Sequence, residues 1–411
     1  MNNVELLKKV MQETGGVFRL LPTWVPRAFC RPGRRIKLHP DDYYALGAER
    51  GGIDERWFAS TTHAENGPLT PDDEGLSYIA LGEGKDDKIL LRTAIEEMGA
   101  EILGDALWNK YHGWSMFSKF FDNLGPLPHH IHHREEHAAR VGCAGKPEMY
   151  FYPSQVNNYG GEFDYTFLGL TPDTTKEQVL EALKNFPKGD NKLLGLSQAY
   201  KLMTDTGFDV PPGLLHAPGS LCTYEPQFAS DVYAMYQSVL LGGHTVSEDL
   251  LWKNCPEEEK GNYEYLLDVI DWELNVDPDL HKNRFMRPIP VRDPAEMEAA
   301  GYFEEWICYK NPLVSAKRLT VRPGARVIIK DAAPYGMINL QGGGTFAGQR
   351  LETPTLIRYG DATYDEYFVS ASAAQKGIEI YNSSASEDIV MLKHFAENPE
   401  LDRFMAAKEA Q

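Results

Sequence analysis

Four stretches of the chain place apolar residues at the spacing of an amphipathic helix. Within the third of these stretches, Thr174 or Thr175 precedes a run with acidic residues in its first turn, so either can cap a helix. The first stretch, MNNVELLKKVMQETGG, has no apolar core and no small-residue cleavage site, which distinguishes it from a signal peptide. We therefore expect helices over residues 1–16, 86–111, 172–206 and 246–275.

Between and after these stretches the pattern favours strands. Residues 114–123, 146–153 and 163–170 are rich in aromatic and apolar side chains, as buried strands are. From about residue 301 short β-rich runs alternate with Gly, Pro and Asp turns, which is typical of an antiparallel sandwich or barrel. The pattern predicts a mainly β protein with helical insertions and two domains. The first covers 1–300 and carries the insertions, and the second covers 301–411.

Composition narrows the classes of partner. The chain has 411 residues, 60 acidic and 41 basic, for a net charge of −19. Such a surface repels phosphate backbones and anionic lipid, which argues against nucleic acid and membrane surfaces as partners. No apolar run approaches the roughly 20 residues that span a bilayer. Nothing in the sequence fixes the oligomeric state.

The cysteines bear on both location and chemistry. Five of them are scattered along the chain, and no C-x-x-C pair occurs. An odd, scattered set does not make a disulfide framework or a zinc knuckle, so the cytoplasm is the expected location. Any metal ion must therefore be held by histidine and carboxylate.

Histidines gather in one short segment, GPLPHHIHHREEHAAR, at residues 125–140. On a strand, positions i and i+2 share a face, so His130 and His132 can reach one ion together. Glu148, on the next predicted strand, and His216, in a Pro- and Gly-rich turn, are the further candidate ligands. Two or three imidazoles with one carboxylate suit zinc, iron, manganese or nickel.

Each of these signals has an alternative interpretation. A polar, solvated loop also explains a histidine cluster, and we assign that role to His129, His133 and His137 as a rim around the ion. A lone histidine such as His216 is more often structural than a ligand. Glu136 rivals Glu148, because its spacing from His130 and His132 approximates a general cupin motif; either glutamate can ligate.

Seven segments, taken in order, resemble the class I mannose-6-phosphate isomerases, also called phosphomannose isomerases. ERWFASTTHAENGP resembles the family's E-x-W-x-x-S segment ending in N-G-P, and LPHHIHHREEHA resembles L-S-x-Q-x-H-P-D-D-E-Y-A. GKPEMYFY resembles G-K-x-E-M-W-Y, and VPPGLLHAPG resembles V-P-A-G-x-x-H-A-x-G. The other three are WSMFSKFFDN, FLGLTPDTTKEQVLEAL and LLDVIDW.

The resemblance implies a fold and a set of site residues. The family consists of zinc-dependent proteins with two cupin (jelly-roll) domains and a helical insertion. Carried over by position, its metal ligands are His130, His132, Glu148 and His216. Lys146 lines the pocket, and Ser60 stands at the family's serine position. The C-terminal domain has a single histidine, His394, and is expected to lack a metal site.

Two departures from the family pattern affect function. His130 replaces the family's glutamine, which enriches the site in nitrogen and can shift metal preference toward iron, nickel or manganese. The family also carries a functional arginine soon after its last ligand, whereas no Lys or Arg lies between His216 and Lys253. The missing arginine puts phosphate recognition in doubt, so a free sugar is nearly as good a substrate candidate as a sugar phosphate.

The resemblance implies an aldose–ketose isomerase that moves a proton between C1 and C2 through a cis-enediol. Candidates for acid–base work are Lys146, Glu136 and His137, and candidates for contacting substrate are Ser60, Lys119 and Arg134. Two other functions stay open. The histidine-for-glutamine replacement favours another cupin chemistry such as an iron-dependent oxygenase, and the missing arginine favours a non-catalytic sugar-binding or regulatory protein.

Overall fold

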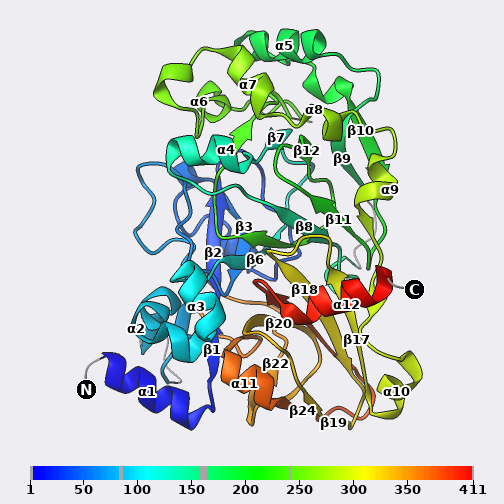
Figure 1. Cartoon of the computed structure of the whole chain (residues 1–411). Coiled ribbons are helices and arrows are strands. Elements are labelled where there is room, and N and C mark those ends of the chain that lie inside the picture. The colour runs from blue at the N-terminus through cyan, green and yellow to red at the C-terminus, as the bar shows by residue number, and fades with distance from the viewer. Residues whose placement is uncertain (1–2, 83–86, 158–163, 241, 410–411) are drawn as a thin grey trace.

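The protein folds into four antiparallel sheets with helices attached at both ends (Figure 1). This computed structural model describes residues 3–82, 87–157, 164–240 and 242–409. The expectation of a mainly β fold with helical insertions is confirmed at this level.

Two sheets frame the histidine-rich segment. A seven-stranded sheet has the order β15-β11-β8-β13-β6-β3-β2, and a five-stranded sheet has the order β10-β9-β12-β7-β14. The first contains β15 (Phe285–Met286), β11 (Gly207–Val210), β8 (Glu148–Phe151), β13 (Thr223–Phe228), β6 (Met116–Phe121), β3 (Gly52–Phe58) and β2 (Thr23–Arg27). The second contains β10 (Ser197–Lys201), β9 (Tyr165–Leu170), β12 (His216–Ala217), β7 (His130–Ile131) and β14 (Ala234–Met235).

The other two sheets come largely from the C-terminal part. The nine-stranded sheet contains β16 (Ile289–Pro290), β17 (Tyr302–Cys308), β18 (Ser315–Val321), β25 (Ile389–Phe395), β20 (Tyr335–Gln341), β23 (Glu366–Val369), β1 (Val17–Leu21), β4 (Tyr78–Ala80) and β5 (Lys88–Leu90). The four-stranded sheet contains β19 (Arg326–Ile329), β24 (Ile378–Asn382), β21 (Gly343–Phe346) and β22 (Gln349–Glu352). Strand β1 pairs with β23, so the N-terminal segment is built into the C-terminal sheet. The domain division at residue 300 stays a prediction.

Each of the four expected regions contains helix, but one region is shorter in helix than expected. The helices are α1 (Asn3–Glu13), α2 (Leu91–Leu103), α3 (Asp105–Tyr111), α4 (Glu135–Ala138), α5 (Lys176–Lys184), α6 (Glu248–Leu251), α7 (Tyr263–Val269), α8 (Trp272–Asn275), α9 (Leu280–Arg284), α10 (Pro294–Ala299), α11 (Ala371–Lys376) and α12 (Pro399–Glu409). Of these, α4, α9, α10, α11 and α12 lie outside the expected regions. Helix α5 begins with a capping box in which Thr175 and Gln178 exchange hydrogen bonds. The expectation that helix continues to residue 206 is wrong. Pro187 ends the regular helix, and Ser197–Lys201 pairs with β9 as a strand.

The seven-stranded and nine-stranded sheets share a buried apolar interface. Phe58, Phe120 and Tyr224 belong to the same hydrophobic cluster as Phe368 and Leu392. Arg56 of β3 crosses this interface and donates two hydrogen bonds, of 2.8 and 2.9 Å, to the carboxylate of Asp365. Among the residues that the structure describes, no helix is long and apolar enough to cross a membrane.

Candidate metal centre

Strand pairing brings two of the predicted histidines face to face. His130 in β7 and His216 in β12 are antiparallel partners, although 86 positions separate them in the chain. His132 follows β7 directly, and its carbonyl accepts a hydrogen bond from the amide of Gly213, three residues before His216. All three imidazoles are buried.

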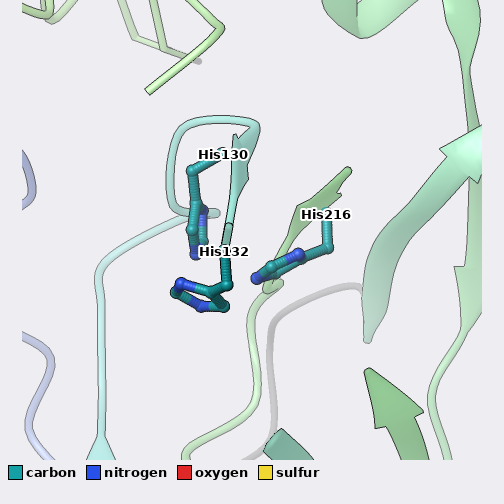
Figure 2. Close-up of side chains that lie close together, drawn as sticks. All are labelled: His130, His132 and His216. Atoms are coloured by element: carbon teal, nitrogen blue, oxygen red, sulfur yellow. The ribbon is translucent and has the colours of Figure 1, made fainter. Parts of the chain in front are cut away.

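The three rings converge on one point (Figure 2). Each offers a nitrogen, and these nitrogens lie within 4.8 Å of one another. The Nδ1 atoms of His130, His132 and His216 lie 2.8 Å from the carbonyl oxygens of Pro128, Val232 and Leu214, respectively. Because a carbonyl only accepts, each Nδ1 carries the proton and each Nε2 keeps a lone pair for a cation.

The fourth candidate ligand comes from the other sheet. Glu148 is the first residue of β8, and its Oε2 lies 2.9 Å from Nε2 of His132. Its Oε1 lies 3.3 Å from Nε2 of His216 and accepts a 2.5 Å hydrogen bond from the hydroxyl of Tyr150. The carboxylate of Glu148 therefore lies against two of the three converging imidazoles, one at each of its oxygens.

The electrostatics of the group fit a divalent cation. Burial lowers the pKa of His132 to about 4, and burial with the neighbouring His216 lowers the pKa of His130 far below its usual value. Although burial opposes it, His132 and Lys146 hold the pKa of Glu148 well below its usual range. Neutral imidazole nitrogens thus face an ionised carboxylate, and Nε2 of His216 and Oε2 of Glu148 make no hydrogen bond among the described residues. Zinc binds such a donor set in four-coordinate sites.

A row of alternating charges extends from Glu148 across the seven-stranded sheet. Lys146 Nζ lies 3.2 Å from Glu148 and 3.7 Å from Glu225 of β13. Lys119 of β6 lies 3.3 Å from Glu225 and 3.2 Å from Glu55 of β3. We refer to Glu148, Lys146, Glu225, Lys119, Glu55, Arg27 and Asp231 as the ionic row.

Arg27 and Asp231 complete that row. Arg27, at the end of β2, places Nη2 3.2 Å from Glu55 and 3.4 Å from Asp231. A cavity of about 30 Å³ lies against the row and is also lined by His130 and His132. Burial, together with the nearby charge of Glu148, raises the pKa of Glu225 to about 8. A carboxyl group with a pKa near neutrality beside a candidate metal site is suited to proton transfer.

Known structures resemble this chain over most of its length, while neither a protein-family model nor a curated protein matches the sequence. The mannose 6-phosphate isomerase from Bacillus subtilis aligns over 92% of this chain and 99% of its own, with a TM-score of 0.56 and 13% identity. A variant of the phosphomannose isomerase from Salmonella typhimurium aligns over 93% and 100%, with a TM-score of 0.59 and 12% identity. The chain has the fold of the mannose-6-phosphate isomerases.

The fold similarity extends to a zinc-bound structure. A mannose 6-phosphate isomerase solved with zinc aligns over 93% of this chain and all of its own, with a TM-score of 0.58 and 11% identity. The resemblance found in the seven sequence segments is therefore confirmed as a shared fold. In the present chain, a buried triad of histidines can hold a metal ion.

The other predicted site residues are divided between the cavity and its surroundings. Lys146 and Lys119 line the cavity. Ser60 is buried, and its hydroxyl lies within a local turn with Thr62. Arg134 donates to the carbonyl of Asp268 and lies 3.2 Å from Glu136.

Glu136 and His137 lie on the short helix α4. The side chain of Glu136 is 59% exposed, whereas that of His137 is buried and lies 3.0 Å from the carboxylate of Asp268. Neither residue lines the cavity. Between the two glutamates that the sequence left open, the geometry favours Glu148.

The rim histidines differ from the sequence expectation in one respect. His129 and His133 are fully buried rather than solvated, and burial lowers the pKa of each to about 3. Both ring nitrogens of His129 lack a hydrogen-bond partner among the described residues. The ring of His129 lies 6.4 Å from that of Phe167 in β9, centroid to centroid.

Sequence reasoning missed four residues of the ionic row, namely Arg27, Glu55, Glu225 and Asp231. The missing arginine after His216 led us to expect few cations at the site, yet Arg27 reaches the cavity from a strand near the N-terminus. One signal was present, since Lys119 stands among the aromatic residues of MFSKFF. A charged side chain inside a buried strand indicates a paired or functional group.

Proposed function

We propose that the protein is a metal-dependent aldose–ketose isomerase whose single divalent ion, zinc or another of the first-row metals, is held by His130, His132, Glu148 and His216. The observation that carries this proposal is the convergence of three buried, Nδ1-protonated imidazoles, two of which contact the carboxylate of Glu148. The fold shared with mannose 6-phosphate isomerases supports the reaction class. The proposal includes two cupin barrels, with the C-terminal one lacking a metal site, and a cytoplasmic location consistent with five free cysteines.

The chemistry divides between the ion and the side chains of this chain. When bound, a divalent cation supplies Lewis-acid stabilisation of a sugar oxygen. Lys146 is buried beside Glu148 and lines the cavity, where its ammonium group can donate to a developing oxyanion. Glu225 faces the same cavity and can exchange a proton between C1 and C2 of the sugar.

The remaining candidates take supporting roles in this proposal. Lys119 holds Glu225 and Glu55 in place and contacts substrate from the floor of the cavity. Four further candidates support the loops and the helix around the site in this proposal: Ser60, Arg134, Glu136 and His137.

The experiment is a turnover screen of zinc-, manganese-, nickel- and iron-loaded protein against aldoses and ketoses, each with and without a phosphate ester. We expect interconversion of one aldose–ketose pair, lost in Glu148→Ala and retained in Glu379→Ala, a matched change at an exposed ion pair. Oxygen consumption is recorded in the same reactions. A metal-loaded protein that isomerises no sugar in the panel would contradict the proposal, and oxygen uptake with iron would favour the oxygenase alternative.

A further inference from the structure

The ionic row leaves each cation of the cavity already paired. Lys146 lies between Glu148 and Glu225, Lys119 lies between Glu225 and Glu55, and Arg27 lies between Glu55 and Asp231. Each of the three positive groups is thus within 3.7 Å of two carboxylates. All seven side chains of the row are buried, so water does not substitute for a lost partner.

The pairing does not depend on the charge of Glu225. If Glu225 is protonated, Lys146 still has Glu148, Lys119 still has Glu55, and Arg27 still has Asp231. Lys253 is close to the row but does not line the cavity; it donates to the carbonyl of Glu65 and the hydroxyl of Tyr233. Among the described residues that line the cavity, every cation therefore has at least one carboxylate partner.

This arrangement is unfavourable for a phosphorylated ligand. A phosphate monoester carries about two negative charges near neutral pH and is bound through charge-assisted hydrogen bonds from free Arg or Lys groups. Here it would have to displace a carboxylate from a buried cation and leave that carboxylate unpaired, which is strongly destabilising. Like-charge repulsion from Glu55 and Asp231 acts in the same direction.

At about 30 Å³ the cavity has room for a group of about the size of a water molecule, and its lining suits a single hydroxyl of a sugar. Glu225 lines the cavity, and its Oε1 makes no hydrogen bond among the described residues, although Lys119 and Lys146 lie 3.3 and 3.7 Å from it. Phe29 and Tyr233 supply aromatic surface on the wall. An uncharged polyhydroxyl ligand can donate to the carboxylates without breaking an ion pair.

We propose that the site takes an uncharged sugar and discriminates against sugar phosphates, because the buried ionic row has no cation to spare for a phosphate group. This inference rests on the proposed function for the identity of the site, and it departs from the phosphorylated substrate named for the structural relatives.

The test measures binding rather than turnover. Zinc-loaded protein is titrated by calorimetry with mannitol and with its terminal phosphate ester, neither of which has a carbonyl group to isomerise. Mannitol binds more tightly, by about ten-fold or more, which corresponds to ~1.4 kcal/mol. Tighter binding of the phosphate ester, or no binding of mannitol, would overturn the inference.

Two variants test the physical cause. Asp231→Asn removes one carboxylate from Arg27, and Glu55→Gln removes one shared by Arg27 and Lys119, so each shifts the affinity ratio toward the phosphate ester. Asp190→Asn is the matched control, since it neutralises an ion-paired aspartate at the surface, beside Lys192, and leaves the ratio unchanged. Circular dichroism confirms that each variant is folded. A ratio that stays at the wild-type value in both folded cavity variants would contradict the assigned cause.

Failure of this inference differs from failure of the proposed function. A protein that isomerises only phosphorylated aldoses contradicts the inference and leaves the isomerase function intact. A protein that binds mannitol selectively and isomerises no sugar leaves the inference intact and removes the function.

Discussion

Nε2 of His132 lies 2.9 Å from Oε2 of Glu148, while Nδ1 of the same ring lies 2.8 Å from the carbonyl oxygen of Val232. With the proton on Nδ1, an imidazole lone pair faces a carboxylate lone pair at hydrogen-bonding distance. Such a contact is favourable only with a cation or a proton between the two atoms. The same pattern recurs for His216, so one cation satisfies both contacts.

The hydrogen bond from Tyr150 to Glu148 is expected to tune metal affinity. It fixes Oε1 of the carboxylate, and loss of such an outer partner typically weakens metal binding by about 10–100-fold. We expect Tyr150→Phe to raise the zinc dissociation constant by at least ~10-fold in a competition titration with a chelator. Tyr152→Phe is the control, because the Tyr152 hydroxyl is buried and has no hydrogen-bond partner among the described residues. Equal affinities in the two variants would remove Glu148 from the ligand set.

The ion pair between Arg56 and Asp365 is expected to stabilise the interface between the seven-stranded and nine-stranded sheets. Arg56→Ala leaves two carboxylates, Asp365 and Glu366, buried without their partner. Removing one partner of a buried pair costs about 3–5 kcal/mol, which urea denaturation measures directly. Arg326→Ala breaks an exposed pair with Glu379 and is expected to cost less than about 1 kcal/mol. If Arg56→Ala lowers the free energy of unfolding by no more than this control does, the buried pair contributes little to stability.

Buried His394 is expected to make the protein less stable in acid. Burial lowers its pKa from the usual 6.5 to about 3, and its Nδ1 pairs with the hydroxyl of Tyr224. In the unfolded chain the imidazole takes up a proton near pH 6.5, whereas in the folded protein it stays neutral until about pH 3. The unfolded state therefore binds more protons in this window, and the unfolding free energy falls as the pH falls.

The contribution of His394 is isolated with His394→Gln, which keeps a polar group opposite Tyr224. The free energy of unfolding is measured in urea between pH 6 and pH 4. With each pH unit of acidification it is expected to fall by up to ~1.4 kcal/mol less in the variant than in the wild type. The other buried histidines titrate equally in both proteins and cancel from the comparison. Identical pH slopes would show that His394 is not held neutral by burial.

The candidate site was partly predictable because two of its features are local. His130 and His132 share a face by the alternation of a strand, and Glu148 opens the next strand of a segment that resembles a known family. His216 was a candidate because of its Pro- and Gly-rich turn, but its pairing with His130 joins residues 86 positions apart and has no local signal. The seven ordered segments therefore identified the fold and the converging histidines together.

The ionic row was not predictable from the sequence. Arg27 and Asp231 are separated by 204 positions, and they meet because β2 and β13, which ends three residues before Asp231, belong to the same seven-stranded sheet. Residue patterns predict which face of a strand is buried, but they do not give the order of strands in a sheet. The sequence shows that no Lys or Arg lies between His216 and Lys253, whereas the position of Arg27 beside the cavity required the structure.

Strand Ser197–Lys201 shows a similar limit at the level of secondary structure. Its sequence, SQAYK, has no strong strand preference, and pairing with β9 overrides the helical pattern that precedes it. Helix α5, by contrast, is set by its own capping box and apolar face, and its N-cap is Thr175, one of the two residues predicted to cap it.

The central claim is that His130, His132, His216 and Glu148 hold one divalent ion, and anomalous diffraction at the zinc edge from crystals of the zinc-loaded protein tests it most directly. We predict one strong peak per chain, bonded to the Nε2 atoms of the three histidines and to a carboxylate oxygen of Glu148 at about 2.0–2.2 Å. A peak at other residues, or none at this position in protein saturated with zinc, would contradict the claim.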